Sequence, residues 1–244
     1  IFYGYWNYIY TLLPIFLTFI GFLTITAVQN YPENRKAIAT IGLILLISPL
    51  LYFKYSNFIF SKTITEYDLP LGISFITFTL IAYIVDVIRG DYKNSEGMKN
   101  LSAYILFFPQ LIAGPILRPK ELLPQLKKSI SWSDLRIMLG VFIFCIGLLK
   151  KVMIADTLAT FVDPVYLDPV SATFNEFVIA FYGFSAQIYF DFSGYTDMAI
   201  GVALVFGIKL PINFNSPYSS HSIQEFWRRW HMTLSRWFKD YVYI

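Results

Sequence analysis

The feature that most constrains this chain is the length of its uncharged apolar runs. Residues 1–28 contain no charged side chain, and further apolar blocks follow along the chain. Charged residues make up 14% of the total and hydrophobic residues 56%, whereas about a quarter of the residues in an average soluble domain are charged. A helix of about 20 apolar residues is long enough to cross a bilayer. The sequence therefore predicts an all-α polytopic membrane protein.

The hydrophobic pattern predicts several membrane segments within one membrane-embedded domain, residues 1–244. The expected segments are Tyr8–Val28, Ala37–Phe53, Leu71–Ile88, Leu101–Leu117, Arg136–Met153 and Phe177–Phe190, with a further apolar block at Met198–Ile208. The chain starts inside an uncharged run with no basic region before it, so no cleavable signal peptide is expected. We interpret the chain as a piece of a longer membrane protein, incomplete at both ends.

The polar residues argue against several functions. The net charge of +3 is small and no basic run is present, so no nucleic-acid partner is expected, and the cations are expected to face lipid phosphates and the cytoplasm. Lys and Arg divide almost evenly between alternate loops, and the basic loop 118–136 is only a weak marker of the cytoplasmic face. Cys145 has no partner for a disulfide. His221 and His231 have no cysteine cluster beside them, so no metal site is expected.

The segment "FFPQLIAGPILRP" is rich in residues that interrupt helices. Pro109, Gly114, Pro115 and Pro119 fall close together, and proline removes a backbone donor. Freed carbonyls at membrane depth are tolerated only inside protein or beside a water-filled cavity. Two interpretations stay open: a broken or re-entrant segment that lines an internal cavity, or a kinked span that ends at a loop.

Three aspartates interrupt or border apolar blocks, where a charge is costly. Asp86 is followed closely by Arg89, and we expect the two to form an ion pair at the membrane edge.

In "QIYFDFSGYTDMAIG", Asp191 and Asp197 flank Gly194, which allows a helix break or a close backbone approach. We expect a structural role for both aspartates, bonded to freed backbone donors or to the guanidinium groups of Arg228 and Arg229. Acid–base catalysis is the alternative.

The segment "SHSIQEFWRRWHMTLSRWFKDYVYI" predicts an aromatic helix. Ser222 and Glu225 form a capping-box pattern, so the helix is expected to start at Ile223. At about 100° per residue the pattern has two faces. One face is expected to carry Trp227, Trp230, His231, Leu234, Trp237, Phe238 and Tyr241. The other is expected to carry Arg228, Arg229, Ser235, Arg236, Lys239 and Asp240.

His231 is the candidate catalytic residue of this helix. An imidazole on an apolar wall is expected to stay neutral at pH 7, and a buried core histidine is the alternative. The basic residues Arg228, Arg229, Arg236 and Lys239 either contact lipid phosphates or help to hold an anionic donor.

Four blocks of the chain together resemble one known family. "PLGISFITFTLIAYIVDVIRG", "FFPQLIAGPILRP", "YFDFSGYTDMAIGVALVFGIKLPINFNSPY" and "SIQEFWRRWHMTLSRWFKDYVYI" look like successive blocks of the membrane-bound O-acyltransferases (MBOAT). The most similar branch contains alginate O-acetyltransferase and its peptidoglycan- and cellulose-acetylating relatives. The teichoic-acid D-alanyl transferases resemble "DFSGYTDMAIG" less closely.

The resemblance implies the N-terminal part of a multi-helix ring with broken helices around a tunnel. His231 matches the histidine of the family's W-x-x-W-H block, and Asp191, Asp197, Trp227 and Trp230 are expected to be tunnel or structural residues. A second histidine of the family, usually regarded as the catalytic one, falls in a block beyond Ile244. The chain is therefore expected to lack the C-terminal half of the fold and to be inactive alone.

The implied activity is O-acetyl transfer in the bacterial inner membrane. Acetyl-CoA or another acetyl thioester is the expected donor, with no bound cofactor, and the acceptor is a hydroxyl of an exported polysaccharide, alginate for example, or of peptidoglycan. An exported serine-hydrolase-like acetyltransferase is the expected partner, besides membrane lipid. D-alanyl transfer to teichoic acid is one alternative. A transporter or channel is another, because broken helices and intramembrane aspartates occur there too.

Overall fold

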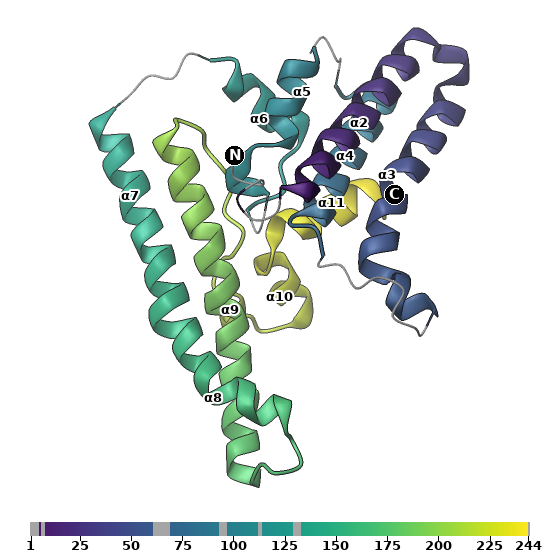
Figure 1. Cartoon of the computed structure of the whole chain (residues 1–244). Helices are drawn as coiled ribbons and strands as arrows, with labels where there is room; N and C mark the ends of the chain where they lie inside the picture. Colours follow the sequence, from purple (N-terminus) through teal and green to yellow (C-terminus); the bar gives the residue numbers. More distant parts are fainter. Residues whose placement is uncertain are drawn as a thin grey trace. The chain divides into compact units, whose positions relative to one another are not determined.

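The computed structural model describes residues 5, 8–60, 69–92, 97–111, 114–128 and 133–243, and all regular secondary structure in these ranges is helical. The predicted all-α class is confirmed (Figure 1). The chain forms two compact units. The first comprises residues 1–112, 116–129 and 237–244, and the second comprises residues 113–115 and 130–236.

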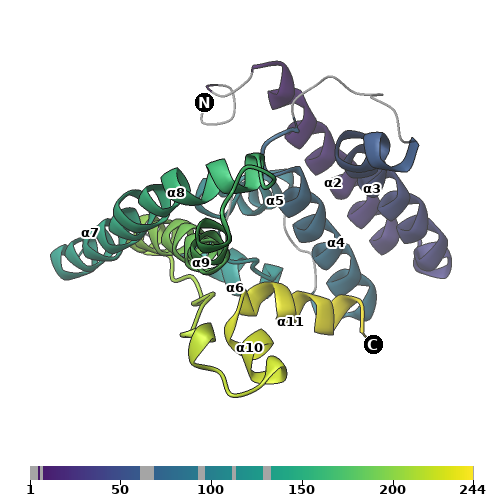
Figure 2. The ribbon, with the colours of Figure 1, turned by 90° about the horizontal axis from the view of Figure 1, so that it is seen from below.

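The first unit is a small helical bundle. Its helices are α2 (Leu12–Asn30), α3 (Arg35–Phe60), α4 (Ile73–Arg89), α5 (Met98–Ile105) and α6 (Pro119–Leu126). Helices α2, α3 and α4 pack against one another (Figure 2). Leu17, Leu46 and Leu80 are fully buried in the core of this bundle, and burial of one such side chain contributes about 1.5–3 kcal/mol.

Three helical stretches of the described chain are long and apolar enough to cross a membrane. They are Ile9–Asn30, Pro32–Phe60 and Asp134–Leu167. They agree with three of the predicted segments, and α4 lies where a fourth was expected. Large apolar side chains such as Phe142 and Phe161 are exposed on these stretches, as lipid-facing surfaces require.

The predicted segment 101–117 is broken, as its prolines indicated. Helix α5 ends at Ile105, a 3-10 helix spans Phe108–Gln110, and the described residues 114–118 are not helical. Two freed carbonyls are satisfied within the protein. Tyr104 donates from its hydroxyl to the carbonyl of Leu117 at 2.8 Å, and the Gln110 amide donates to the carbonyl of Tyr104 at 2.8 Å. No continuous helix spans this segment in the described residues, and the choice between a cavity-lining segment and a kinked span that ends at a loop stays open.

The predicted ion pair between Asp86 and Arg89 is wrong. Asp86 Oδ1 instead accepts a hydrogen bond of 2.8 Å from the Tyr241 hydroxyl, and Arg89 donates to the backbone carbonyl of Asp240 at 2.7 Å. The partners of both residues, Tyr241 and Asp240, lie more than 150 positions later in the chain. The local spacing of Asp86 and Arg89 therefore did not indicate them.

The second unit contains a long helical hairpin. One arm is continuous from α7 (Asp134–Leu149) through a π-helical turn (Lys150–Ala155) to α8 (Asp156–Leu167). The other arm is α9 (Phe174–Val205), which runs back along the first (Figure 1). Thr173 caps α9 in a reciprocal arrangement with Glu176. The predicted end of a segment at Phe190 is therefore wrong, because α9 continues without a break.

Glycines bring the two arms of the hairpin into backbone contact. A Cβ atom on Gly194 would lie 2.7 Å from the carbonyl oxygen of Gly147, and one on Gly201 would lie 2.5 Å from that of Gly140. Small residues permit this approach between membrane helices. Of the two roles predicted for Gly194, the structure shows the close approach and excludes the break.

Candidate functional site

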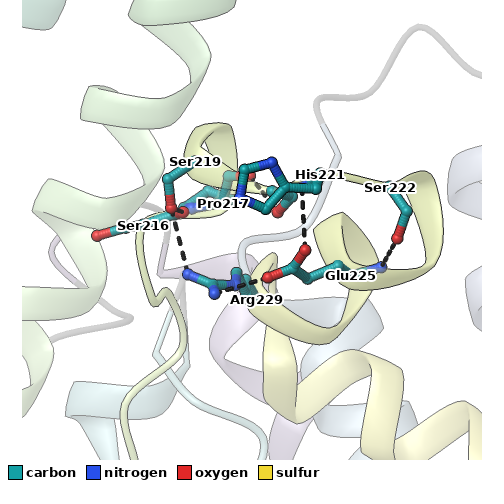
Figure 3. Close-up of polar contacts among 8 residues, drawn as sticks. Ser216, Pro217, Ser219, His221, Ser222, Glu225 and Arg229 are labelled. Carbon is teal, nitrogen blue, oxygen red and sulfur yellow. Dashed lines mark hydrogen bonds and ion pairs between the residues drawn. The ribbon is translucent and has the colours of Figure 1, made fainter.

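The polar cluster at the start of α10 (Ile223–Arg229) fixes where this helix begins. Ser222 Oγ accepts from the backbone N–H of Glu225 at 3.1 Å, and Glu225 Oε2 accepts from the backbone N–H of His221 at 2.9 Å (Figure 3). Glu225 also pairs with Arg229 at 2.7 Å. The predicted start at Ile223 is confirmed, with the reciprocal bond made to His221 instead of to the N-cap N–H.

The expected continuous aromatic helix is wrong. Helix α10 ends at Arg229, Trp230 is extended, and α11 spans Met232–Tyr241. Between them His231 has a φ of +42°, a left-handed conformation that costs a non-glycine residue about 1–2 kcal/mol. The two predicted faces therefore do not extend across the break. Strain of this kind persists only where surrounding contacts impose it, and it clusters at functional sites.

The contacts that impose the break come from a segment before α10. The backbone N–H of Asn215 donates to the carbonyl of Arg229 at 3.0 Å, and that of Met232 donates to the carbonyl of Asn213 at 2.9 Å. The Asn213 side chain also accepts from the backbone N–H of Thr233 at 3.1 Å. Helix ends need such external partners, and this segment serves the last turn of α10 and the first turn of α11 together.

Asn213 also determines which nitrogen of His231 carries the proton. Its Oδ1 lies 3.1 Å from His231 Nδ1 and accepts from both the backbone N–H and the hydroxyl of Thr233. A backbone N–H can only donate, so the Asn213 atom in this position is the amide oxygen. An amide oxygen can only accept, so Nδ1 of His231 must donate. The lone pair of the neutral imidazole is therefore on Nε2.

The surroundings of His231 keep its ring neutral. The residue is 8% exposed, and its ring meets that of Phe192 edge-on at 4.7 Å and that of Phe214 at 6.4 Å. Burial lowers the pKa of His231 to about 4, because the charged form loses its hydration. At pH 7 the ring is an uncharged acceptor, which agrees with the neutral state predicted from the sequence.

Asp191 and Asp197 on α9 bind lysines and not the predicted guanidinium groups. Lys150 pairs with Asp197 at 2.6 Å, and Lys151 pairs with Asp191 at 2.7 Å and with Asp156 at 2.5 Å. The lysines lie in the π-helical turn, so the pairs with Asp191 and Asp197 join the two arms of the hairpin, whereas the pair with Asp156 lies within the first arm. This arrangement supports the structural role that the sequence favoured.

The remaining predicted site residues are not brought together. Trp230 packs within 5.5 Å of Phe214 and Phe226, whereas Trp227 is 55% exposed. Arg229 is held by Glu225 and Ser219 (Figure 3), and Arg228 is exposed. Arg236 belongs to the second unit and Lys239 to the first. The described residues therefore do not bring these four cations to one shared ligand.

Sequence reasoning missed Asn213, the residue that organises the site. It precedes Phe214 in "INFNSPY", where nothing in spacing or periodicity separates it from Asn215. Its importance depends on pairing with residues 18 and 20 positions later in the chain, across a helix break that the sequence pattern did not show.

Three apolar helical stretches and a buried polar site beside intramembrane ion pairs define a polytopic membrane protein. The sequence model of the membrane-bound O-acyltransferase family matches residues 2–244. The chain belongs to this family, as its four sequence blocks indicated.

Individual relatives divide between two activities. The chain is 40% identical to the peptidoglycan O-acetyltransferase of Helicobacter pylori, an alignment that covers 100% of this chain and 53% of the relative. It is also 40% identical to the probable alginate O-acetylase AlgI of Pseudomonas aeruginosa, covering 100% and 50%. Identity to the teichoic acid D-alanyltransferase of Bacillus subtilis is 36%, covering 71% and 45%. The chain thus spans about half the length of the curated relatives it matches.

Proposed function

We propose that the full-length protein is an O-acetyltransferase that acts on hydroxyls of peptidoglycan or of an exported polysaccharide. The observation that carries this proposal is the fixed, neutral imidazole of His231, whose Nε2 keeps its lone pair. The names of the relatives aligned over the whole chain supply the acyl group and the class of acceptor.

The chemistry follows from the protonation state of His231. A bare Nε2 accepts a hydrogen bond from the hydroxyl of the acceptor, or of a serine on a relay partner, and so makes that oxygen a better nucleophile. The oxygen then bonds to the acetyl carbon while the C–S bond of the thioester breaks, and the hydroxyl proton passes through the base to the leaving thiolate, which departs as a thiol. In this proposal His231 orients the reacting groups or supports a second base elsewhere in the full-length protein, and it is not the only base.

The setting follows from the same proposal. Acetyl-CoA, or another cytoplasmic acetyl thioester, is the donor, and the protein lies in the bacterial inner membrane. An exported serine-hydrolase-like acetyltransferase receives the acetyl group and passes it to the glycan.

D-alanyl transfer to teichoic acid is the second candidate. The observation that favours it is the 36% identity to the Bacillus subtilis D-alanyltransferase over 71% of this chain. The donor distinguishes the two candidates: full-length protein in vesicles that consumes only D-alanyl thioester, and no acetyl-CoA, would replace the first candidate by the second.

The test compares the two histidines. We expect His231→Ala in the full-length protein to lower acetyl transfer at least tenfold, or about 1.4 kcal/mol in barrier, with melting near that of the wild type. His221→Ala is the matched control, because His221 contributes its backbone N–H to the α10 cap (Figure 3), and it should leave transfer unchanged. Full activity of His231→Ala, or its unfolding, would show that His231 is only a packed core residue.

A further inference from the structure

A pocket of about 400 Å³ in the first unit is lined mainly by charged side chains. Three segments form its wall: the end of α4, the start of α6 and the end of α11. The lining residues are Asp86, Arg89, Asp91, Arg118, Lys120, Lys239, Asp240 and Tyr241. These segments belong to three of the four blocks that carry the family resemblance, and the proposed transfer chemistry at His231 uses none of their charges.

Two of the three acidic residues in the wall are bound by other parts of the wall. Asp240 forms an ion pair with Arg118, and its backbone carbonyl accepts from Arg89 at 2.7 Å. Asp86 accepts from the Tyr241 hydroxyl at 2.8 Å. Burial raises the pKa of Tyr241 above its usual value, so this hydroxyl stays a donor. These contacts hold the two guanidinium groups in place at the pocket.

The pocket has more hydrogen-bond donors than acceptors. Lys120 and Lys239 form no hydrogen bond or ion pair within the described part of the chain, and Asp91 is the one acidic lining residue not bound by the wall. Each guanidinium also has five N–H groups, and the contacts of Arg89 and Arg118 with Asp240 use only some of them. Four cationic and three acidic side chains leave a net charge of +1, and the uncommitted donors favour an anionic guest.

We propose that this pocket binds the phosphate group of a ligand. A phosphate offers several oxygens to donors from different directions, which suits two lysines and two preoriented arginines better than the single edge of a carboxylate does. A soluble nucleotide-type phosphate and a phospholipid headgroup present the same chemistry. The proposal concerns binding; its soluble-nucleotide branch rests on acetyl-CoA as the donor of the proposed function, and its lipid branch does not.

The experiment removes the two uncommitted cations. Lys120→Gln/Lys239→Gln is made in the full-length protein, in phosphatidylcholine nanodiscs, and compared with Lys99→Gln/Lys128→Gln. The control pair carries the same change in net charge, lies in the same unit and does not line the pocket. The first arm titrates adenosine 3′,5′-bisphosphate by calorimetry. The second arm measures phosphatidylglycerol adducts by native mass spectrometry after its addition to the nanodiscs.

We expect the pocket variant to weaken one of the two probes at least tenfold, and the control variant to change it less than twofold. A loss confined to the bisphosphate identifies a soluble phosphate ligand, and a loss confined to the phosphatidylglycerol adducts identifies a lipid headgroup. Equal effects of the two variants, or binding of neither probe to the wild type, would overturn the proposal. Acetyl transfer is not the readout, so this outcome is separate from that of the proposed function.

Discussion

The hairpin of α7–α9 and the break between α10 and α11 belong to the same unit but are held in place by different kinds of contact. In the hairpin, long regular helices approach until the backbones touch at Gly147 and Gly194, and lysine–aspartate pairs join the arms. At the break, two short helices stop and restart around His231, whose left-handed backbone is held by Asn213. Regular packing gives the hairpin its rigidity, whereas distant capping contacts impose the geometry of the histidine.

The contrast indicates where stability and chemistry reside. In the hairpin, Lys150 and Lys151 pair with aspartates on the facing arm, so these contacts hold the two arms together. At the break, one amide oxygen serves the backbone of α11, the hydroxyl of Thr233 and the ring of His231. A change at Asn213 therefore alters the helix start and the histidine together, and a change in the hairpin alters stability first.

The largest effect is expected from filling the glycine contact of the hairpin. A Cβ on Gly194 would lie 2.7 Å from the backbone oxygen of Gly147 and 3.1 Å from the backbone nitrogen of Lys151. These are backbone atoms of the facing arm, so they can move away only if that arm moves. We expect Gly194→Ala to lower the free energy of unfolding by about 3 kcal/mol, measured by unfolding of the full-length protein in detergent.

Gly183→Ala on the same helix is the control for that substitution. Its Cβ would meet only the end of the Val162 side chain, at 2.9 Å, and a side chain can shift. The free energy of unfolding is expected to change by less than about 1 kcal/mol there, because alanine favours a helix over glycine by about that amount and this gain offsets the cost of shifting Val162. Equal losses for both variants would show that the backbone contact is not what closes the hairpin.

The next effect concerns the ion pair between Lys150 and Asp197. Asp197→Leu leaves Lys150 without its partner in an apolar stretch, where an isolated charge costs at least about 2.5 kcal/mol. We expect a loss of about 2.5 kcal/mol, most of which Lys150→Met/Asp197→Leu recovers because the charge is gone. Asp156→Asn should cost less, since Lys151 keeps Asp191. A double variant no more stable than Asp197→Leu would contradict this account.

The smallest expected effect is the pH dependence of stability that the buried His231 causes. The pKa of His231 is lowered to about 4 in the folded protein, from 6.5 in the unfolded chain. Between these two pKa values the unfolded chain binds more protons than the folded protein does. The contribution of neutral His231 to the free energy of unfolding is therefore complete above the unfolded pKa, and it is lost as the pH falls toward the folded pKa. For this group we expect a loss of about 2 kcal/mol between pH 7 and pH 5.

Asn213→Asp isolates that contribution from other titrating groups. It keeps an oxygen toward Thr233 and places a carboxylate beside Nδ1, which raises the pKa of His231. The loss of stability between pH 7 and pH 5, measured by chemical unfolding, should therefore shrink relative to the wild type. The same pH dependence in both proteins would mean that Asn213 does not set the protonation of His231.

The sequence predicted the regular parts of the molecule well, for a physical reason. Hydropathy and caps act within a few residues, so the apolar spans, the start of α10 at Ile223 and an interruption near Pro109, either a break or a kink, all followed from local pattern. The continuation of α9 through Asp191 and Asp197 did not, because lysines on the facing arm neutralise aspartates that looked like a break.

The sequence identified His231 as the candidate site residue, but it did not predict the geometry around it. His231 stood out by its aromatic neighbours and by the family resemblance, and its neutrality followed from burial alone. Its left-handed backbone and its tautomer did not follow, because both depend on Asn213, and periodicity carries no information about a partner 18 residues away. The hydrogen bond from Tyr241 to Asp86, 155 residues apart, was missed for the same reason.

The most direct test of the account is the protonation of the His231 ring itself. The full-length protein is labelled with ¹⁵N-histidine, and the His231 signals are identified by solid-state NMR as those absent from His231→Ala. At pH 7 we expect one protonated nitrogen, Nδ1, and one bare nitrogen, Nε2, with the Nδ1 signal changed in Asn213→Ala. An imidazolium ring, or a proton on Nε2 in place of Nδ1, would contradict the claim that Asn213 holds His231 as a neutral acceptor.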